Sequence, residues 1–268
     1  LLIFGCGPVP PLGVAGAALA TVSGQLLGMT VGFFLVSGRK DLSLSLRRFR
    51  PSGDVIREIY RIGLPAIVMQ SLATFMTLGL NKIMALFSES AVFILGVYFK
   101  IQSFIFMPVF GLNNGLTPVV GYNYGARSRG RIVALIRFAL EIGVVIMAVG
   151  TLLLALFPHR FLQLFHAESN VLATGVSALR MISSGFVFAG VSVILCAAFQ
   201  AMGASMLSLA VSLSRQLVLI LPAALLLGHF SPRFMWLCFP IAELLSCLLA
   251  LLFYRKVYRE KLVPMSER

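Results

Sequence analysis

The amino-acid sequence predicts an all-α, polytopic membrane protein with about seven transmembrane helices. Of its 268 residues, 59% are hydrophobic and only 12% are charged, whereas a soluble globular protein carries about 25% charged residues. The apolar residues also fall in long runs, and a helix needs about 20 of them to cross a bilayer. A soluble core would be divided into shorter, periodic segments. The composition therefore argues against a water-soluble domain.

Seven apolar runs are the candidates for these helices. The expected spans are 12–36, 59–87, 91–121, 132–157, 171–200, 205–228 and 234–254. Several of them exceed the length needed to cross a bilayer, so we expect tilted helices or ends that extend into water.

One long polar stretch, residues 37–58, separates the first span from the other six. Many secondary transporters consist of two related halves. If such a protein with six helices in each half were cut just before the last helix of its first half, one helix followed by six would remain. We expect 1–36 to hold the last helix of an N-terminal lobe and 37–58 to be a basic linker. Residues 59–254 would form a C-terminal six-helix lobe, and 255–268 a tail. Since the chain begins with Leu1 and not with Met, we expect a fragment or a trimmed chain.

The basic residues lie in alternate connections between the spans. They are concentrated in the linker, in the turn after the third span and in the tail, while the opposite connections hold only Arg160 and Arg233. The positive-inside rule therefore places the three basic segments in the cytoplasm. The net charge of +13 then reflects topology and contact with anionic lipid heads, so we expect no nucleic-acid partner.

Charged residues inside the apolar runs are expensive unless they are paired or hydrated, so they usually face the interior of a bundle. They are Lys100, Glu141, Arg180, Arg215 and Glu243. At roughly 1.5 Å per residue, Lys100, Arg215 and Glu243 reach a similar depth in the membrane. We therefore expect Glu243 to pair with Arg215 or with Lys100. Glu141 follows Arg137 by four residues, which favours a local pair on one helix.

Amides and prolines also interrupt the apolar runs. The embedded amides are Gln70, Asn81, Gln102, Asn113, Asn114 and Gln200. Some amides only join helix to helix, but six in so apolar a chain favour at least one water-accessible cavity. Pro108 and Pro118 lie within the third span, where each removes a backbone hydrogen bond. They indicate either a static kink or a hinge, and both interpretations stay open.

No pattern in the sequence indicates a catalytic centre. The three histidines lie in expected outer connections and form no HExxH spacing. The four cysteines form no CxxC pair and are interpreted as small buried hydrophobic residues. We therefore expect no enzyme activity, no cofactor and no bound metal.

The segment Met107–Ala126, MPVFGLNNGLTPVVGYNYGA, resembles a helix and cytoplasmic turn of multidrug and toxic compound extrusion (MATE) transporters. Its matching positions are Pro108, Gly111, Gly115, Pro118, Asn123, Gly125 and Ala126. Four further segments, 13–25, 61–71, 197–203 and 235–245, are similar to other helices of this family, in the same order along the chain. Residues 96–115, GVYFKIQSFIFMPVFGLNNG, are most similar to the bacterial multidrug-export branch.

This resemblance implies a twelve-helix antiporter of the bacterial inner membrane that exports cationic amphipathic compounds in exchange for H⁺ or Na⁺. The implied partners are the lipid bilayer, small organic cations and the remaining N-terminal helices of the same protein. One branch of the family carries a cation-binding glutamate on its seventh helix, where this chain has Ala73, so the coupling residues stay unassigned.

A substrate cavity is expected inside the lobe, lined by polar side chains and by aromatic faces that attract organic cations. The expected lining residues are Gln70, Asn81, Tyr98, Lys100, Gln102, Asn113 and Asn114. Other functions stay open. A lipid-linked saccharide flippase of the same twelve-helix plan would need a wide cationic cavity, and the chain could also be a non-transporting structural remnant. The residues of the third span favour multidrug export.

Overall fold

The computed structural model describes residues 3, 5, 11–37, 52–165 and 169–265. All regular secondary structure within these residues is helical, as the composition predicts. The chain divides into two compact units, Leu1–Ile56 and Arg57–Arg268, and each is considered by itself. The first unit contains α1 (Gly13–Ser37), and the boundary falls in the first turns of α2.

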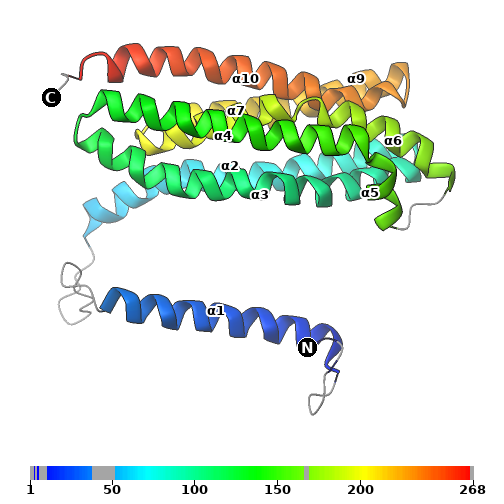
Figure 1. Ribbon diagram of the computed structural model, residues 1–268, viewed down its shortest axis with the longest axis horizontal. Helices are drawn as coiled ribbons and strands as arrows, with labels where there is room; N and C mark the ends of the chain where they lie inside the picture. Colours follow the sequence, from blue (N-terminus) through cyan, green and yellow to red (C-terminus); the bar gives the residue numbers. More distant parts are fainter. Residues whose placement is uncertain (1–2, 4, 6–10, 38–51, 166–168, 266–268) are drawn as a thin grey trace. The chain divides into compact units, whose positions relative to one another are not determined.

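The second unit is a bundle of helices. Its elements are α2 (Gly53–Phe87), α3 (Glu89–Gly125), α4 (Arg129–Leu156), α5 (Pro158–Leu164), α6 (Ser169–Ser183), α7 (Phe186–Ala201), α8 (Ser205–Leu213), α9 (Ile220–Phe230) and α10 (Cys238–Val257). A π-helical segment (Ser214–Leu219) joins α8 to α9, a 3₁₀ turn (Phe234–Leu237) precedes α10, and a second π-helical segment (Tyr258–Leu262) follows it. Figure 1 shows α3 and α4 side by side, with α5 at one end of the bundle and the C-terminal end of α10 at the other.

The expected number of membrane spans is confirmed. Six helical stretches of the described residues are long and apolar enough to cross a membrane, and the bent pair of α6 and α7 makes a seventh. The boundaries differ most from those expected at three places. Helix α2 begins at Gly53, inside the expected linker, with Asp54 in its first turn. A negative charge at this position interacts favourably with the helix dipole. The linker residues 38–51 lie outside the described residues.

The other two differences lie at the ends of the bundle. The connection expected between the fourth and fifth spans contains α5, which begins with Pro158, a residue favoured at the first position of a helix. The expected tail continues the last helix as far as Leu262.

The expected span 171–200 is a broken helix, in which α6 and α7 meet at an angle of 43°. Side chains satisfy the backbone at this bend: the Thr151 hydroxyl donates to the Ser183 carbonyl (2.9 Å), and the Ser184 hydroxyl donates to the Met181 carbonyl (2.7 Å). Gly185 lies at the bend against α10, where a Cβ atom would be only 2.9 Å from Pro240 Cα. The bend therefore needs a residue without a side chain at its contact with α10.

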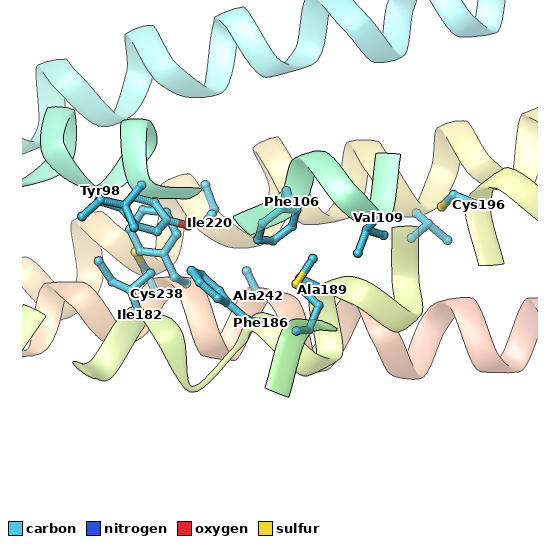
Figure 2. Close-up of a cluster of buried hydrophobic side chains, with 14 of the residues drawn as sticks. Tyr98, Phe106, Val109, Ile182, Phe186, Ala189, Cys196, Ile220, Cys238 and Ala242 are labelled. Atoms are coloured by element: carbon cyan, nitrogen blue, oxygen red, sulfur yellow. The ribbon is translucent and has the colours of Figure 1, made fainter. Parts of the chain in front are cut away.

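The core of the second unit lies between α3, α7 and α10. Figure 2 shows Tyr98 and Phe106 of α3 beside Phe186 of α7. The Phe106 and Phe186 rings are 5.3 Å apart edge to face, and the Tyr98 ring is 4.9 Å from that of Phe239 on the α10 side. Such separations fall within the range of about 4.5–7 Å that aromatic pairs prefer. These rings join three helices at the position where the candidate site is found.

The last helical segment, Tyr258–Leu262, contacts the ends of other helices at one end of the bundle. Lys261 Nζ donates to the Met202 carbonyl at the end of α7 (3.0 Å) and lies 5.7 Å from the centre of the Tyr124 ring at the end of α3. Arg129, at the start of α4, donates to the Tyr258 hydroxyl. We call these five residues the C-terminal clamp. The clamp connects the ends of three helices that are separated along the chain.

A substitution at Gly185 tests the bend. We expect Gly185→Ala to destabilise the lobe by about 1–3 kcal/mol, because the added methyl group meets the backbone of Pro240, which cannot move aside like a side chain. Gly96→Ala is the control, since a Cβ at Gly96 meets no atom within 4 Å. Thermal unfolding in detergent, followed by circular dichroism, measures both. Equal melting temperatures for the two variants would contradict the close contact.

Candidate functional site

Two adjoining cavities lie inside the second unit. The first, which we call the aromatic cavity, has a volume of about 190 Å³ and is lined by Ala73, Met76, Tyr98, Phe99, Gln102, Ser103, Phe106, Phe110, Val193, Arg215, Gln216, Ile220, Phe239 and Glu243. The second, the amide cavity, has a volume of about 250 Å³ and is lined by Phe110, Asn113, Asn114, Thr117, Ser192, Val193, Cys196, Ala197, Gln200, Val211, Ser212 and Arg215. The two cavities share Phe110, Val193 and Arg215.

An ion pair joins Arg215 to Glu243 where the cavities meet. The Arg215 Nη1 atom is 3.4 Å from Glu243 Oε1 and 3.5 Å from Oε2, and the two side chains are 21% and 10% exposed. These distances are longer than the roughly 2.7–2.9 Å of a tight charged hydrogen bond, and one nitrogen serves both oxygens in place of a two-nitrogen fork. The pair expected from the sequence is confirmed, with Arg215 and not Lys100 as the partner.

The π-helical segment contributes Arg215 and Gln216 to the wall of the aromatic cavity. Pro222 has no N–H group, so it cannot donate a hydrogen bond to the carbonyl of Val218, four residues earlier. Val218 lies within the π-helical segment. A π turn within an α-helix is often found at a functional site. Pro222 is therefore the sequence signal that could have indicated an irregular helix here.

Asn113 leaves one polar atom without a partner. Its Nδ2 atom donates weakly to the Val193 carbonyl at 3.4 Å, but its Oδ1 atom accepts no hydrogen bond within the described part of the chain. The side chain is nevertheless only 9% exposed. Since most buried amide atoms are satisfied, the amide cavity can accommodate one further donor, from a water molecule or from a ligand.

Four of the seven expected cavity residues line these two cavities. Tyr98 and Gln102 line the aromatic cavity, and Asn113 and Asn114 line the amide cavity. Their spacing along α3 keeps them near one face of the helix. The sequence analysis missed Thr117, Ser192, Ser212 and Gln216, because small or isolated polar residues are ordinary in apolar helices.

The structure does not bring Gln70, Asn81 or Lys100 into either cavity. Lys100 is exposed, because two residues before Gln102 corresponds to about 200° of rotation around α3. The Asn81 Nδ2 atom donates to the Thr77 carbonyl of its own helix (2.8 Å). Gln70 lies one turn before Ala73, beyond the cavity, and is exposed. Their assignment to a substrate cavity stays a prediction.

Two further charges named inside the expected spans, Arg180 and Glu141, have partners outside the cavities. Arg180 Nε donates to the Ala155 carbonyl (3.0 Å), one of the last carbonyls of α4, which have no partner within their own helix. Arg137 and Glu141 form the expected local pair at 2.9 Å, on an exposed surface. Pro108 and Pro118 lie within α3, which continues through both residues, and their role as a hinge stays a prediction.

Long apolar helices around two internal cavities and a nearly buried ion pair define a polytopic all-α membrane protein. The MatE family model matches residues 65–226, more than half of the chain. The chain therefore belongs to this family of multidrug and toxic compound extrusion transporters. Membership of a transporter family also supports the expectation that the protein is not an enzyme.

The curated relatives include multidrug export proteins of staphylococci. The chain is 26% identical over 204 residues to the multidrug export protein MepA of Staphylococcus haemolyticus and 27% identical over 212 residues to that of Staphylococcus aureus strain MSSA476. Each alignment covers 76% of this chain and 44% of the relative. The chain thus spans less than half the length of these relatives.

Solved structures show the same fold. The bent form of the MATE transporter VcmN of Vibrio cholerae matches with a TM-score of 0.86 at 21% identity, covering 95% of this chain and 58% of that chain. A MOP superfamily transporter from Pyrococcus furiosus matches with a TM-score of 0.85 at 25% identity, covering 95% and 57%. The all-α membrane fold expected from the sequence is confirmed.

A double-mutant cycle measures the coupling within the ion pair. We expect Arg215→Gln or Glu243→Gln alone to destabilise the chain by roughly 1–3 kcal/mol, less than the about 3–5 kcal/mol of a fully buried pair, since Arg215 keeps some exposure. The double variant should cost less than the sum of the two. Denaturant unfolding in mixed micelles gives these values.

The pair of Arg137 and Glu141 is the matched control for this cycle. Both of its side chains are exposed, at 80% and 60%, so its coupling should be about 0.3–0.5 kcal/mol. If Arg215 and Glu243 coupled no more strongly than this control, their contact would have little energetic importance.

Proposed function

We propose that the chain is the C-terminal part of a secondary active multidrug efflux antiporter that exports cationic amphipathic compounds in exchange for H⁺ or Na⁺. The observation that carries the proposal is the aromatic cavity with Glu243 at its wall. Aromatic faces attract organic cations, and Glu243 is the one carboxylate among the residues that line either cavity. The curated relatives, which are multidrug export proteins, support the same activity.

The size of the cavities supports a shared site. Volumes of about 190 and 250 Å³ fall below the roughly 300–1,000 Å³ of typical ligand pockets. We infer that further helices of the same protein, preceding this chain, complete the site. The exposed Gln70 and Lys100 would then face these helices. The amphipathic substrate would bind between the two lobes.

The proposed location is the bacterial inner membrane. The basic linker 37–58 and the tail 255–268 would lie in the cytoplasm, together with the C-terminal clamp. The positive-inside rule and the basic residues Arg129 and Lys261 at that end of the bundle support this orientation. Pro108 and Pro118 would serve as a hinge in the long helix α3 during alternating access.

The alternative of a saccharide flippase has less support. It needs a wide cationic cavity, but Glu243 neutralises Arg215, and Lys100 and Arg180 line neither cavity. A purely structural remnant would not explain why polar residues of five helical segments surround connected cavities. Transport of organic cations therefore remains the better-supported proposal.

An efflux assay tests the proposed function. The chain, joined to the upstream helices of its natural protein, is produced in cells loaded with ethidium, and ethidium fluorescence is followed after energisation. We expect efflux that stops when the coupling gradient is collapsed. A protonophore and a sodium-free medium distinguish the two coupling ions. An inserted protein that never exports ethidium under either gradient would contradict the proposal.

A substitution of Asn113 tests whether the amide cavity contributes to transport. We expect Asn113→Leu to leave stability nearly unchanged, because the variant loses a weak hydrogen bond but also removes an unsatisfied oxygen. Efflux should become roughly tenfold less efficient, the equivalent of one lost ligand hydrogen bond. Gln163→Leu, on the exposed surface of α5, is the control and should export normally. Full efflux by folded Asn113→Leu would exclude Asn113 from the substrate path.

A further inference from the structure

A groove on the surface of the lobe lies between the end of α3 and the start of α4. It has a volume of about 450 Å³ and is lined by Val119, Tyr122, Asn123, Arg131, Ala134, Leu135 and Phe138. The four α4 residues follow one another at a spacing of three or four, so they form one stripe along that helix. Tyr122 and Phe138 are 77% and 60% exposed. The groove is therefore mostly apolar and open to the surroundings of the lobe.

This groove lies on the side of α3 that faces away from the two internal cavities. Thr117 lines the amide cavity, and Tyr122, five residues later, lines the groove. Five residues of an α-helix correspond to about 140° of rotation. Helices that complete the cavities from their own side would therefore leave the groove uncovered. In a bilayer, lipid molecules surround such a face.

One end of the groove is strongly basic. The segment 122–131 contains three arginines, and 255–262, which the C-terminal clamp holds beside it, contains four basic residues. The one acidic residue of these two segments, Glu260, lies 4.0 Å from Lys256. Arg131 contacts no carboxylate within the part of the chain that the structure describes. Its guanidinium group is therefore available for a phosphate, which arginine binds with two parallel hydrogen bonds.

The apolar part of the groove begins where an acyl chain would follow such a phosphate. Phe138 comes seven residues after Arg131, which corresponds to about 10 Å along α4. One leaflet supplies about half of the roughly 30 Å hydrocarbon core, so the groove can hold most of the length of one chain. The small Ala134 keeps the groove hollow midway. Tyr122 lies near the basic end, and tyrosine is enriched at the depth of lipid head groups.

The net charge of the head group decides which phospholipid fits. A zwitterionic lipid would bring its own cationic group among the arginines of 122–131, and this repulsion would offset the contact between its phosphate and Arg131. An anionic phospholipid has no such group. Basic pockets between transmembrane helices on the cytoplasmic side are known to bind anionic head groups.

We propose that this groove binds one anionic phospholipid, whose phosphate contacts Arg131 and whose acyl chain lies along Leu135 and Phe138. The proposal goes beyond the proposed export function and does not depend on it. It also does not depend on the orientation of the protein, since it requires only a bilayer that contains the lipid.

Site-specific crosslinking provides the test. The chain, joined to its upstream helices, is placed in nanodiscs with equal amounts of phosphatidylglycerol and phosphatidylcholine that carry the same acyl chains. A photoreactive benzoylphenylalanine replaces Phe138, and mass spectrometry identifies the adducts. The control replaces Leu252 of α10, which is 59% exposed and close to the basic Arg255, so it reports the general attraction of anionic lipid to this end of the bundle.

We expect the ratio of phosphatidylglycerol to phosphatidylcholine adducts to be at least fivefold higher at position 138 than at position 252. Equal ratios at the two positions would overturn the proposal. Adducts at position 138 that join it mainly to another segment of the protein would also overturn it, because the groove would then be an interface between helices.

Variants of Arg131 locate the selectivity. Arg131→Gln should lower the ratio at position 138 about fivefold, the effect of one basic residue near an anionic surface, and Arg131→Lys should restore most of it because the charge returns. Arg255→Gln is the control, since it removes an exposed basic residue that does not line the groove, and it should leave the ratio nearly unchanged. An unchanged ratio in Arg131→Gln would overturn the role of Arg131.

Filling the groove tests the place of the acyl chain. Ala134 is exposed, so Ala134→Phe fills the groove without entering the core, and the yield of phosphatidylglycerol adducts at position 138 should fall at least fivefold. Ala148→Phe is the control, because Ala148 is an exposed alanine of the same helix that does not line the groove. An equal yield in the two variants would overturn the proposed position of the acyl chain.

Discussion

The hydrocarbon interior of a bilayer offers no hydrogen-bond partners, so the backbone of a membrane protein must satisfy itself. Three places in this lobe where regular helix ends or bends illustrate this constraint. The Thr151 side chain donates a hydrogen bond to the carbonyl of Ser183 at the bend between α6 and α7. Arg180 donates to the carbonyl of Ala155 at the end of α4, and Lys261 donates to that of Met202 at the end of α7. Side chains replace the missing backbone partners at all three places.

The same irregularities give the lobe its internal polarity. The π-helical segment before Pro222 turns Arg215 and Gln216 together into the aromatic cavity, and the bend at Gly185 lets α7 approach α10 closely. Regular helices with all-round apolar surfaces would pack without leaving polar space between them. The π-helical segment thus supplies the arginine of the ion pair, and hydrogen bonds from side chains satisfy the backbone at the bend between α6 and α7.

The sequence predicts the helices well because crossing a bilayer demands long apolar runs, and counting depth along them was enough to pair Glu243 with a cation. The sequence predicts poorly which face of each helix points toward the interior of the bundle. A helix that is apolar on all sides has no strong amphipathic pattern, so Lys100 and Gln102 could not be assigned to different faces of α3. The break at Ser183–Gly185 was missed because serine and glycine are common within continuous membrane helices, and the π-helical segment has no signal besides Pro222.

The C-terminal clamp bears on how the protein is made. Its members Tyr258 and Lys261 contact the ends of α3, α4 and α7, and the ribosome adds them after all three helices. Chains generally begin to fold from their N-terminal side during synthesis. The ends of the three earlier helices therefore lack these contacts until the residues of the last helical segment have been added.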